Sequence, residues 1–144
     1  MSFNFSVPSR VDNQLAETGV DLNITSNGIN FGTFKVCYID PYNPRDELKL
    51  KRIKQKYAGQ LRRKELTEWD EIRITLVEAN LLGWSGVKDG KGKEVPFSVE
   101  AAHAYFSMEQ TRWIMLELAR RASDVETFAP ETDELENAEA IEKN

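Results

Sequence analysis

Residues 82–98 read LGWSGVKDGKGKEVPFS, and this stretch divides the chain into two helical halves. The helical pattern before it is predicted to end at Gly83, a residue type common just past helix C-termini. Ser98 is placed to cap the helix that follows. Between these two points, Asp89-Gly90 favours a tight turn, because glycine reaches positive φ without a steric penalty and aspartate tolerates it.

Short apolar pieces flank this turn at residues 84–87 and 94–97. We therefore expect a small central β-hairpin. Its second strand is short or lies at a sheet edge, because Pro96 cannot donate a ladder hydrogen bond.

The composition indicates one ordinary folded domain. The chain has 144 residues, of which 40% are hydrophobic and 30% are charged, with a formal net charge of -5. This size suits a single core. The lone Cys37 offers no disulfide framework and fits a reducing compartment. The N-terminal residues lack the apolar core of a signal peptide, and no run approaches the length of a membrane span. We expect a soluble cytosolic protein that does not enter membranes.

Charge is distributed unevenly along the chain. Residues 45–64 carry nine basic and two acidic side chains, whereas residues 123–144 carry eight acidic side chains and one lysine. The two segments have opposite charge, so they can attract each other or bind separate partners.

The first forty residues predict an arm and a β-hairpin. Residues 1–14 have few apolar anchors and are expected to form a flexible arm. Apolar and polar residues alternate over residues 20–24, and the return strand runs over residues 29–39 after the Asn27-Gly28 turn. A bulge at Gly32 would bring the aromatic residues on either side of it to one face.

Four helical patterns follow the hairpin. Asn43 and Pro44 mark the start of a basic helix with apolar residues at helical spacing, and Thr67 with Asp70 forms a capping box for the helix over residues 66–82. Ser98 caps a short helix, and the last helix ends near Ala122. That last helix is expected to bury Trp113, Ile114, Leu116 and Leu118. The predicted fold class is α+β: an N-terminal β-hairpin and about four helices around the central hairpin, forming one domain over residues 15–122.

Residues 123–144 are predicted to form a flexible acidic tail. Its apolar residues are single and widely spaced, so they cannot offset the entropy of ordering the segment. Its candidate partner contacts are Phe128, Leu135 and Ile141.

No residue pattern indicates catalysis, a metal or a cofactor. His103 is the only histidine, so a two-histidine metal site is excluded, and a structural role on its helix is far more common. Cys37 is expected to be a packed thiol rather than a nucleophile. The glycines of residues 83–92 are spread over a turn and lack the Gly-Lys-Ser/Thr of a phosphate loop.

The basic helix of residues 45–64 leaves two readings open. Its nine cations can contact nucleic-acid phosphates. Apart from Tyr57, which falls on the apolar stripe, the helix has no aromatic residue for base stacking. A solvated face, or one that complements an acidic partner or the chain's own tail, is therefore favoured over nucleic acid.

The central stretch resembles a signature of the tail assembly chaperones of long-tailed, siphovirus-type bacteriophages. The signature reads W-x-G-V, then D-x-x-G, then V-P-F-S-x-E, and the resemblance covers roughly residues 20–144. The residues that carry it are Trp84, Gly86, Asp89, Gly90, Pro96, Phe97 and Ser98.

The resemblance implies a non-enzymatic assembly factor. Such proteins bind the tape-measure protein and promote polymerisation of the major tail tube protein in the host cytoplasm, and they are generally absent from the mature virion. Many of these phages also make a longer form by ribosomal frameshifting, and residues 142–144 would suit an A-rich slippery site. Two alternatives stay open: a structural minor tail or head-to-tail joining protein, and, more weakly, a nucleic-acid-binding regulator using residues 45–64.

Overall fold

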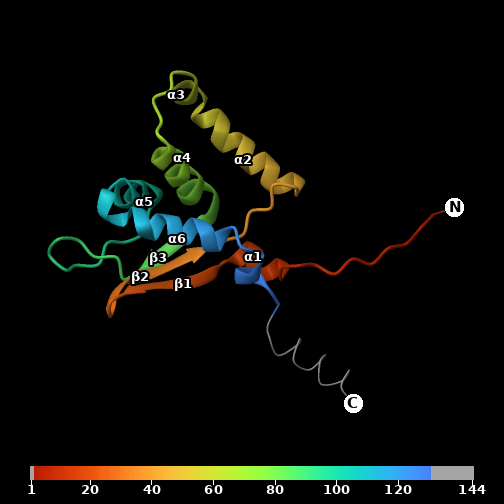
Figure 1. Ribbon diagram of the computed structural model, residues 1–144, viewed down its shortest axis with the longest axis horizontal. Coiled ribbons are helices and arrows are strands. Elements are labelled where there is room, and N and C mark those ends of the chain that lie inside the picture. The colour runs from red at the N-terminus through yellow and green to blue at the C-terminus, as the bar shows by residue number, and fades with distance from the viewer. Residues whose placement is uncertain (1, 131–144) are drawn as a thin grey trace, which may run out of the picture.

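The computed structural model describes residues 2–130 and confirms an α+β fold. A three-stranded antiparallel sheet in the order β1-β2-β3 packs against helices, and α2 and α3 extend away from the sheet (Figure 1). The elements are α1 (Asn13–Thr18), β1 (Val20–Ser26), β2 (Ile29–Val36), α2 (Pro44–Lys56), α3 (Ala58–Arg62), α4 (Glu68–Thr75), the π-helical turn η1 (Leu76–Asn80), β3 (Leu81–Ser85), α5 (Val99–Phe106), the 3-10 turn η2 (Glu109–Thr111), α6 (Arg112–Ala122) and the 3-10 turn η3 (Val125–Phe128). The described residues thus hold six α-helices rather than about four.

The N-terminal hairpin forms, but its return strand ends at Val36 and not at residue 39. Asn27 and Gly28 connect β1 to β2 with φ values of 51° and 78°. The register shifts after the Ile24–Gly32 pair, so Phe31 is an extra residue in β2. Gly32 has a φ of 125°, and a Cβ there would lie 2.9 Å from the Ser85 carbonyl oxygen, so the bulge requires glycine.

The bulge places Phe31 beside the core. Phe31 is half-buried and meets the Trp113 ring at 5.0 Å between centroids. Phe34 and Val36, further along β2, are fully buried. Ile29, which pairs with Ser26 at the hairpin end, remains 58% exposed.

The helix predicted over residues 66–82 ends earlier than expected. It begins with the Thr67–Asp70 capping box and becomes a π-helical turn after Thr75. Leu81–Ser85 then forms β3, which pairs with β2 so that Trp84 lies opposite Phe34. Asn80 holds this change of direction, because its carbonyl accepts from the Cys37 N–H at 2.8 Å and its Nδ2 donates to the Cys37 carbonyl at 3.1 Å.

The small central hairpin forms, but it is shorter than expected and its first strand begins in the main sheet. Trp84 and Ser85 belong to β3, and in the loop of residues 86–97 Lys88 bridges Glu94 in antiparallel fashion (Figure 1). The Asp89 N–H donates to the Lys93 carbonyl and the Val95 N–H to the Val87 carbonyl, both at 2.8 Å. Asp89 does shape the turn, since its Oδ1 accepts from the N–H groups of Lys91 and Lys93. The left-handed conformation, however, falls on Gly92 (φ 78°) and not on Gly90.

The last helix buries a different set of residues from the predicted one. Ile114 and Leu118 are buried as expected, but Trp113 is 41% exposed and Leu116 is 44% exposed. The sheet covers only one side of α6, and the residues on that side are Ile114, Met115, Leu118 and Ala122. Leu116 lies on the opposite side of α6, and Trp113 lies at the edge of the buried side, where its ring meets Phe31 of β2.

Phe128 belongs to the core and not to a tail. It is fully buried in η3, and its ring lies 5.4 Å from that of Tyr38. Its carbonyl accepts from the Asp12 N–H at 2.7 Å, and the Asp12 side chain caps α1. Packing therefore extends past both ends of the predicted domain of residues 15–122, and Phe128 is not available to a partner. The other predicted contacts, Leu135 and Ile141, lie outside the described residues.

We expect Phe128→Ala to lower the free energy of unfolding by about 3–5 kcal/mol, because it removes a fully buried aromatic side chain and leaves a cavity. Leu116→Ala, on the exposed face of α6, is the matched control and should cost less than about 1 kcal/mol. Urea unfolding followed by tryptophan fluorescence measures both. Equal effects of the two variants would contradict the burial of Phe128.

Candidate functional site

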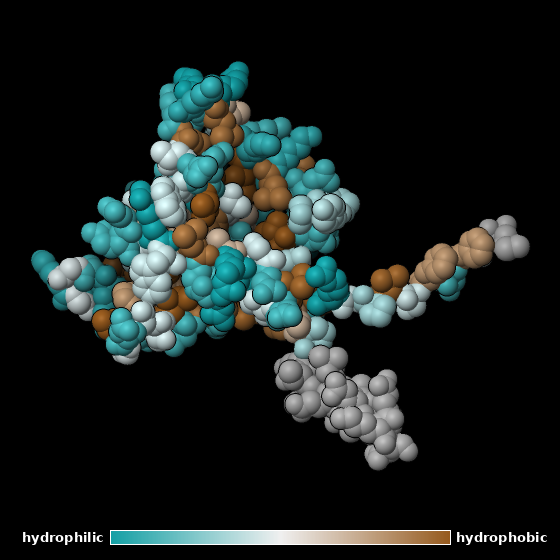
Figure 2. All heavy atoms as spheres, viewed as in Figure 1, coloured by the Kyte–Doolittle hydropathy of each residue, from teal (hydrophilic) through white to brown (hydrophobic). Residues whose placement is uncertain are grey.

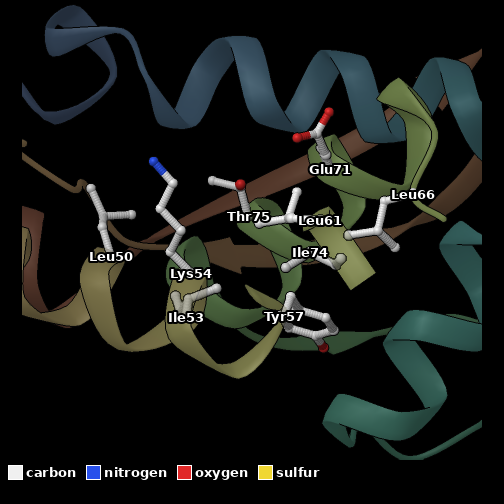
Figure 3. Close-up of a pocket in the computed structure, with 9 residues that line it drawn as sticks. All are labelled: Leu50, Ile53, Lys54, Tyr57, Leu61, Leu66, Glu71, Ile74 and Thr75. Atoms are coloured by element: carbon white, nitrogen blue, oxygen red, sulfur yellow. The ribbon is translucent and has the colours of Figure 1, made fainter. Parts of the chain in front are cut away.

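An apolar groove lies between the α2–α3 pair and α4 (Figure 3). Its volume is about 240 Å³. In the space-filling view, apolar atoms gather between α2 and α4 and are bordered by hydrophilic side chains (Figure 2). The lining residues are Leu50, Ile53, Lys54, Tyr57, Leu61, Leu66, Glu71, Ile74 and Thr75.

The groove exists because α2 is only partly covered by the rest of the domain. The Asn43 side chain accepts from the Arg45 N–H at 3.0 Å and Pro44 takes the first helical position, as the sequence predicted. The apolar stripe of α2 follows at helical spacing, yet Asp46 is the only buried residue of this helix. Leu50 and Ile53 are half-buried, so the domain leaves part of their apolar surface in water.

Helix α2 carries three exposed cations with no carboxylate partner among residues 2–130, and one of them, Lys54, lines the groove, as does Glu71 of α4. Lys51, Arg52 and Lys54 are exposed, and within residues 2–130 no carboxylate lies at ion-pair distance from any of them. The cations at the two ends of α2 do have partners: Arg45 pairs with Glu17 at 3.2 Å, and Lys56 pairs with Glu78 at 2.6 Å. An apolar floor with Lys54 at its α2 edge favours a ligand that is apolar on one face and has a carboxylate at the edge that meets α2.

Glu78 of η1 fastens one end of the groove. Its carboxylate accepts hydrogen bonds from Lys56 Nζ and from the Tyr57 hydroxyl, which ties the α2–α3 junction to the domain body. Burial raises the pKa of Glu78, but the hydrogen bonds from Lys56 and Tyr57 outweigh it, so the pKa lies below its ordinary value. Glu78 therefore stays ionised and holds α2 in place.

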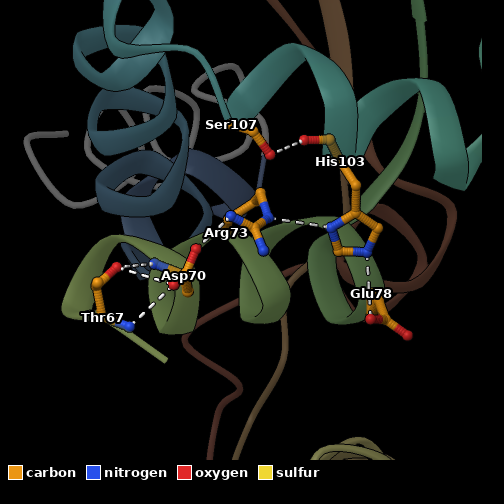
Figure 4. A network of polar contacts seen from close by, with 6 residues as sticks. All are labelled: Thr67, Asp70, Arg73, Glu78, His103 and Ser107. Carbon is orange, nitrogen blue, oxygen red and sulfur yellow. Dashed lines mark hydrogen bonds and ion pairs between the residues drawn. The ribbon is translucent and has the colours of Figure 1, made fainter. Parts of the chain in front are cut away.

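A second set of polar contacts joins Glu78 to α4 and α5 (Figure 4). Arg73 Nε donates to His103 Nδ1 at 3.3 Å, and Arg73 pairs with Asp70 at 2.7 Å. The neutral His103 ring then carries its proton on Nε2, which donates to Glu78 at 3.2 Å. Burial lowers the pKa of His103; Glu78 opposes this shift, and the Arg73 charge adds to it.

These contacts assign structural roles to the residues with reactive groups. Both His103 nitrogens have protein partners. Cys37 is buried, its Sγ lies 3.3 Å from the Ala79 carbonyl oxygen, and burial raises the pKa of its thiol. Across the described residues, no three histidine, cysteine, aspartate or glutamate side chains gather where they could hold a metal ion. Among residues 2–130, no helix is both long enough and apolar enough to cross a membrane.

The residues of the central signature hold the loop after β3 against the sheet. Trp84 Nε1 donates to the Val95 carbonyl at 2.8 Å, and its ring meets Phe97 edge-on at 5.3 Å. The Gly86 N–H donates to Glu94 Oε1 at 2.7 Å. Ser98 caps α5 by accepting from the Ala101 N–H, and Pro96 lies exposed between these two anchors. None of these residues lines the groove.

The sequence predicts the apolar stripe of α2 but not that the stripe is only half-buried. The groove was not predicted because half-burial depends on how closely α4 approaches α2. The sequence analysis also did not predict that Glu78 would bind Lys56 and Tyr57, or that Thr75 would line the groove. No local pattern distinguishes these two residues from other helical residues.

A comparison with family models finds a match to the YdaY prophage protein over residues 40–141. The matched span includes all the groove-lining residues and excludes β1 and β2. No curated protein and no solved structure matches the chain.

The polar contacts of His103 predict how stability depends on pH. Because the folded-state pKa lies below the ordinary 6.5, the unfolded chain binds more protons, so stability falls as pH decreases through that value. We expect His103→Gln, which keeps a hydrogen-bonding side chain but does not titrate, to lose less stability than wild type between about pH 7.5 and 5.5. Urea midpoints at the two pH values measure this. If the stability of wild type and of His103→Gln fell equally between the two pH values, His103 would not be the cause of the pH dependence.

Proposed function

Because the chain belongs to the YdaY prophage protein family and is thus phage-related, we propose that it is a phage tail assembly chaperone. On this proposal it binds the tape-measure protein and promotes polymerisation of the tail tube, without catalysis. The phage origin of the family supports the proposal, as does the resemblance carried by Trp84, Gly86 and the Pro96-Phe97-Ser98 run.

The observation that carries the proposal is the unfilled groove between α2–α3 and α4. An amphipathic helix binds to such a groove by laying its apolar face on the floor, with anchor residues at helical spacing. Half-buried Leu50, Ile53 and Leu61 supply the floor, and Lys54 supplies a charge at the edge. A long helical client such as a tape-measure protein offers many such faces.

The size of the groove suits a contact that must later be released. A floor of a few half-exposed side chains buries much less surface than a permanent interface. Repeated weak contacts along a long client can still hold it, because neighbouring sites raise the effective concentration of one another. On this proposal the chain covers the client in the host cytoplasm, together with the major tail tube protein and any longer frameshifted form of itself, and leaves before the virion is complete.

Co-expression of the full chain with segments of the tape-measure protein from the same phage tests the function. We expect at least one helical segment to co-purify. Thr75→Trp should reduce its capture by about tenfold, corresponding to about 1.4 kcal/mol, because Thr75 is exposed at the groove and a larger side chain fills it. Ile53→Asp, which places a charge on the floor, should act in the same direction.

Leu116→Asp is the matched control, since Leu116 is also an apolar residue but is exposed on α6 and does not line the groove. Its capture should equal that of wild type, and circular dichroism checks that all variants fold. Failure of every tape-measure segment to bind would refute the proposal. Mass spectrometry of purified particles separates the alternative: stoichiometric presence of the chain would identify a structural virion component instead.

A further inference from the structure

We infer that the groove between α2–α3 and α4 binds the C-terminal segment of the same chain, residues 131–144. The contact itself does not depend on the proposed function. Only its consequence, competition between this segment and a client, rests on that function.

Charge is the first reason. Residues 131–144 contain six acidic side chains and one lysine, a net charge of -5, which equals the net charge of the whole chain. Residues 1–130 are therefore electrically balanced overall. Within them, the middle of α2 presents Lys51, Arg52 and Lys54 without carboxylate partners among the described residues. The segment is therefore complementary in charge to the α2 side, where Lys54 lines the groove, whereas Glu71 on the α4 side has the same sign as the segment.

The apolar pattern of the segment is the second reason. Leu135, Ala138 and Ile141 recur every three residues, and a glutamate directly follows each of them. In a helical conformation these three would share one face, with carboxylates beside it. Such a face matches a groove with an apolar floor and Lys54 at its α2 edge.

The third reason is reach. The described chain ends two residues after Phe128, whose ring contacts Tyr38, and Val125 shares a hollow with Tyr42 just before α2. Fourteen residues span at most about 46–50 Å when extended. The 13 residues of α2 span only about 20 Å. The segment can therefore lie along the whole groove.

The N-terminal arm is a poorer occupant. Phe3, Phe5 and Val7 are strongly exposed on it, but residues 2–10 contain no carboxylate and include Arg10. The arm thus offers nothing to the cations of α2. The match to the YdaY prophage protein also extends to residue 141, so it includes both Leu135 and Ile141.

Carbodiimide cross-linking of the wild-type full chain tests this contact in the absence of any client. The reagent joins lysine amines to nearby carboxylates, and mass spectrometry identifies the joined residues. We expect Lys54 to cross-link to carboxylates of residues 131–142 at least about fivefold more than Lys91, an exposed lysine of the loop after β3. Cross-links in mixed ¹⁴N and ¹⁵N protein should join peptides of one isotope only.

The Leu135→Ser/Ile141→Ser double variant separates groove binding from simple charge attraction, because it keeps every carboxylate. Its Lys54 cross-links should fall by about fivefold. Equal yields at Lys54 and Lys91, an unchanged yield in the double variant, or mixed-isotope cross-links alone would each overturn the inference. A tape-measure segment that fails to bind would count against the proposed function but would leave these yields unchanged.

Discussion

The pairing of β3 with β2 is the interaction on which the other features of this molecule depend. The helical chain that begins at Glu68 must stop at Asn80 and turn back along the sheet, so that Trp84 lies opposite Phe34. A π-helical turn with the hydrogen bonds between Asn80 and Cys37 makes this turn. Because η1 is fixed in this way, Glu78 is placed where Lys56, Tyr57 and His103 all reach it. The position of α2, and with it the groove, follows from those contacts.

Local signals in the sequence were sufficient wherever a few neighbouring residues determine the backbone. Asn43 with Pro44, Thr67 with Asp70, Ser98, and Asn27-Gly28 all mark the ends and turns at which the structure has them. Each satisfies backbone groups within a few residues of itself, so the interaction and its signal lie in the same short stretch.

The wrong predictions of secondary structure and burial concern segments whose structure depends on contacts with residues distant in the sequence. Leu81–Ser85 continues a helical apolar pattern, but the unpaired edge of β2 offers it backbone partners more than forty residues away in sequence. Phe128 looked isolated because its contacts, Tyr38 and Asp12, lie far back in the chain. Trp113 and Leu116 were assigned to the core because hydropathy does not reveal which side of α6 the sheet covers. The groove likewise depends on distant contacts. The apolar stripe of α2 can be predicted from the sequence, but the half-burial of its residues cannot.

The formal net charge of the chain lies entirely in residues 131–144, and this affects how strongly copies of the protein repel one another. Net charge keeps molecules of one protein apart in solution, and a protein with none at the working pH tends to associate and precipitate. Here the mutual repulsion between molecules comes entirely from the last fourteen residues, since the rest of the chain is balanced. A protease that removed this segment would leave a neutral particle with exposed Phe3, Phe5 and Val7. The formal net charge that keeps copies of this protein apart is thus carried by residues 131–144.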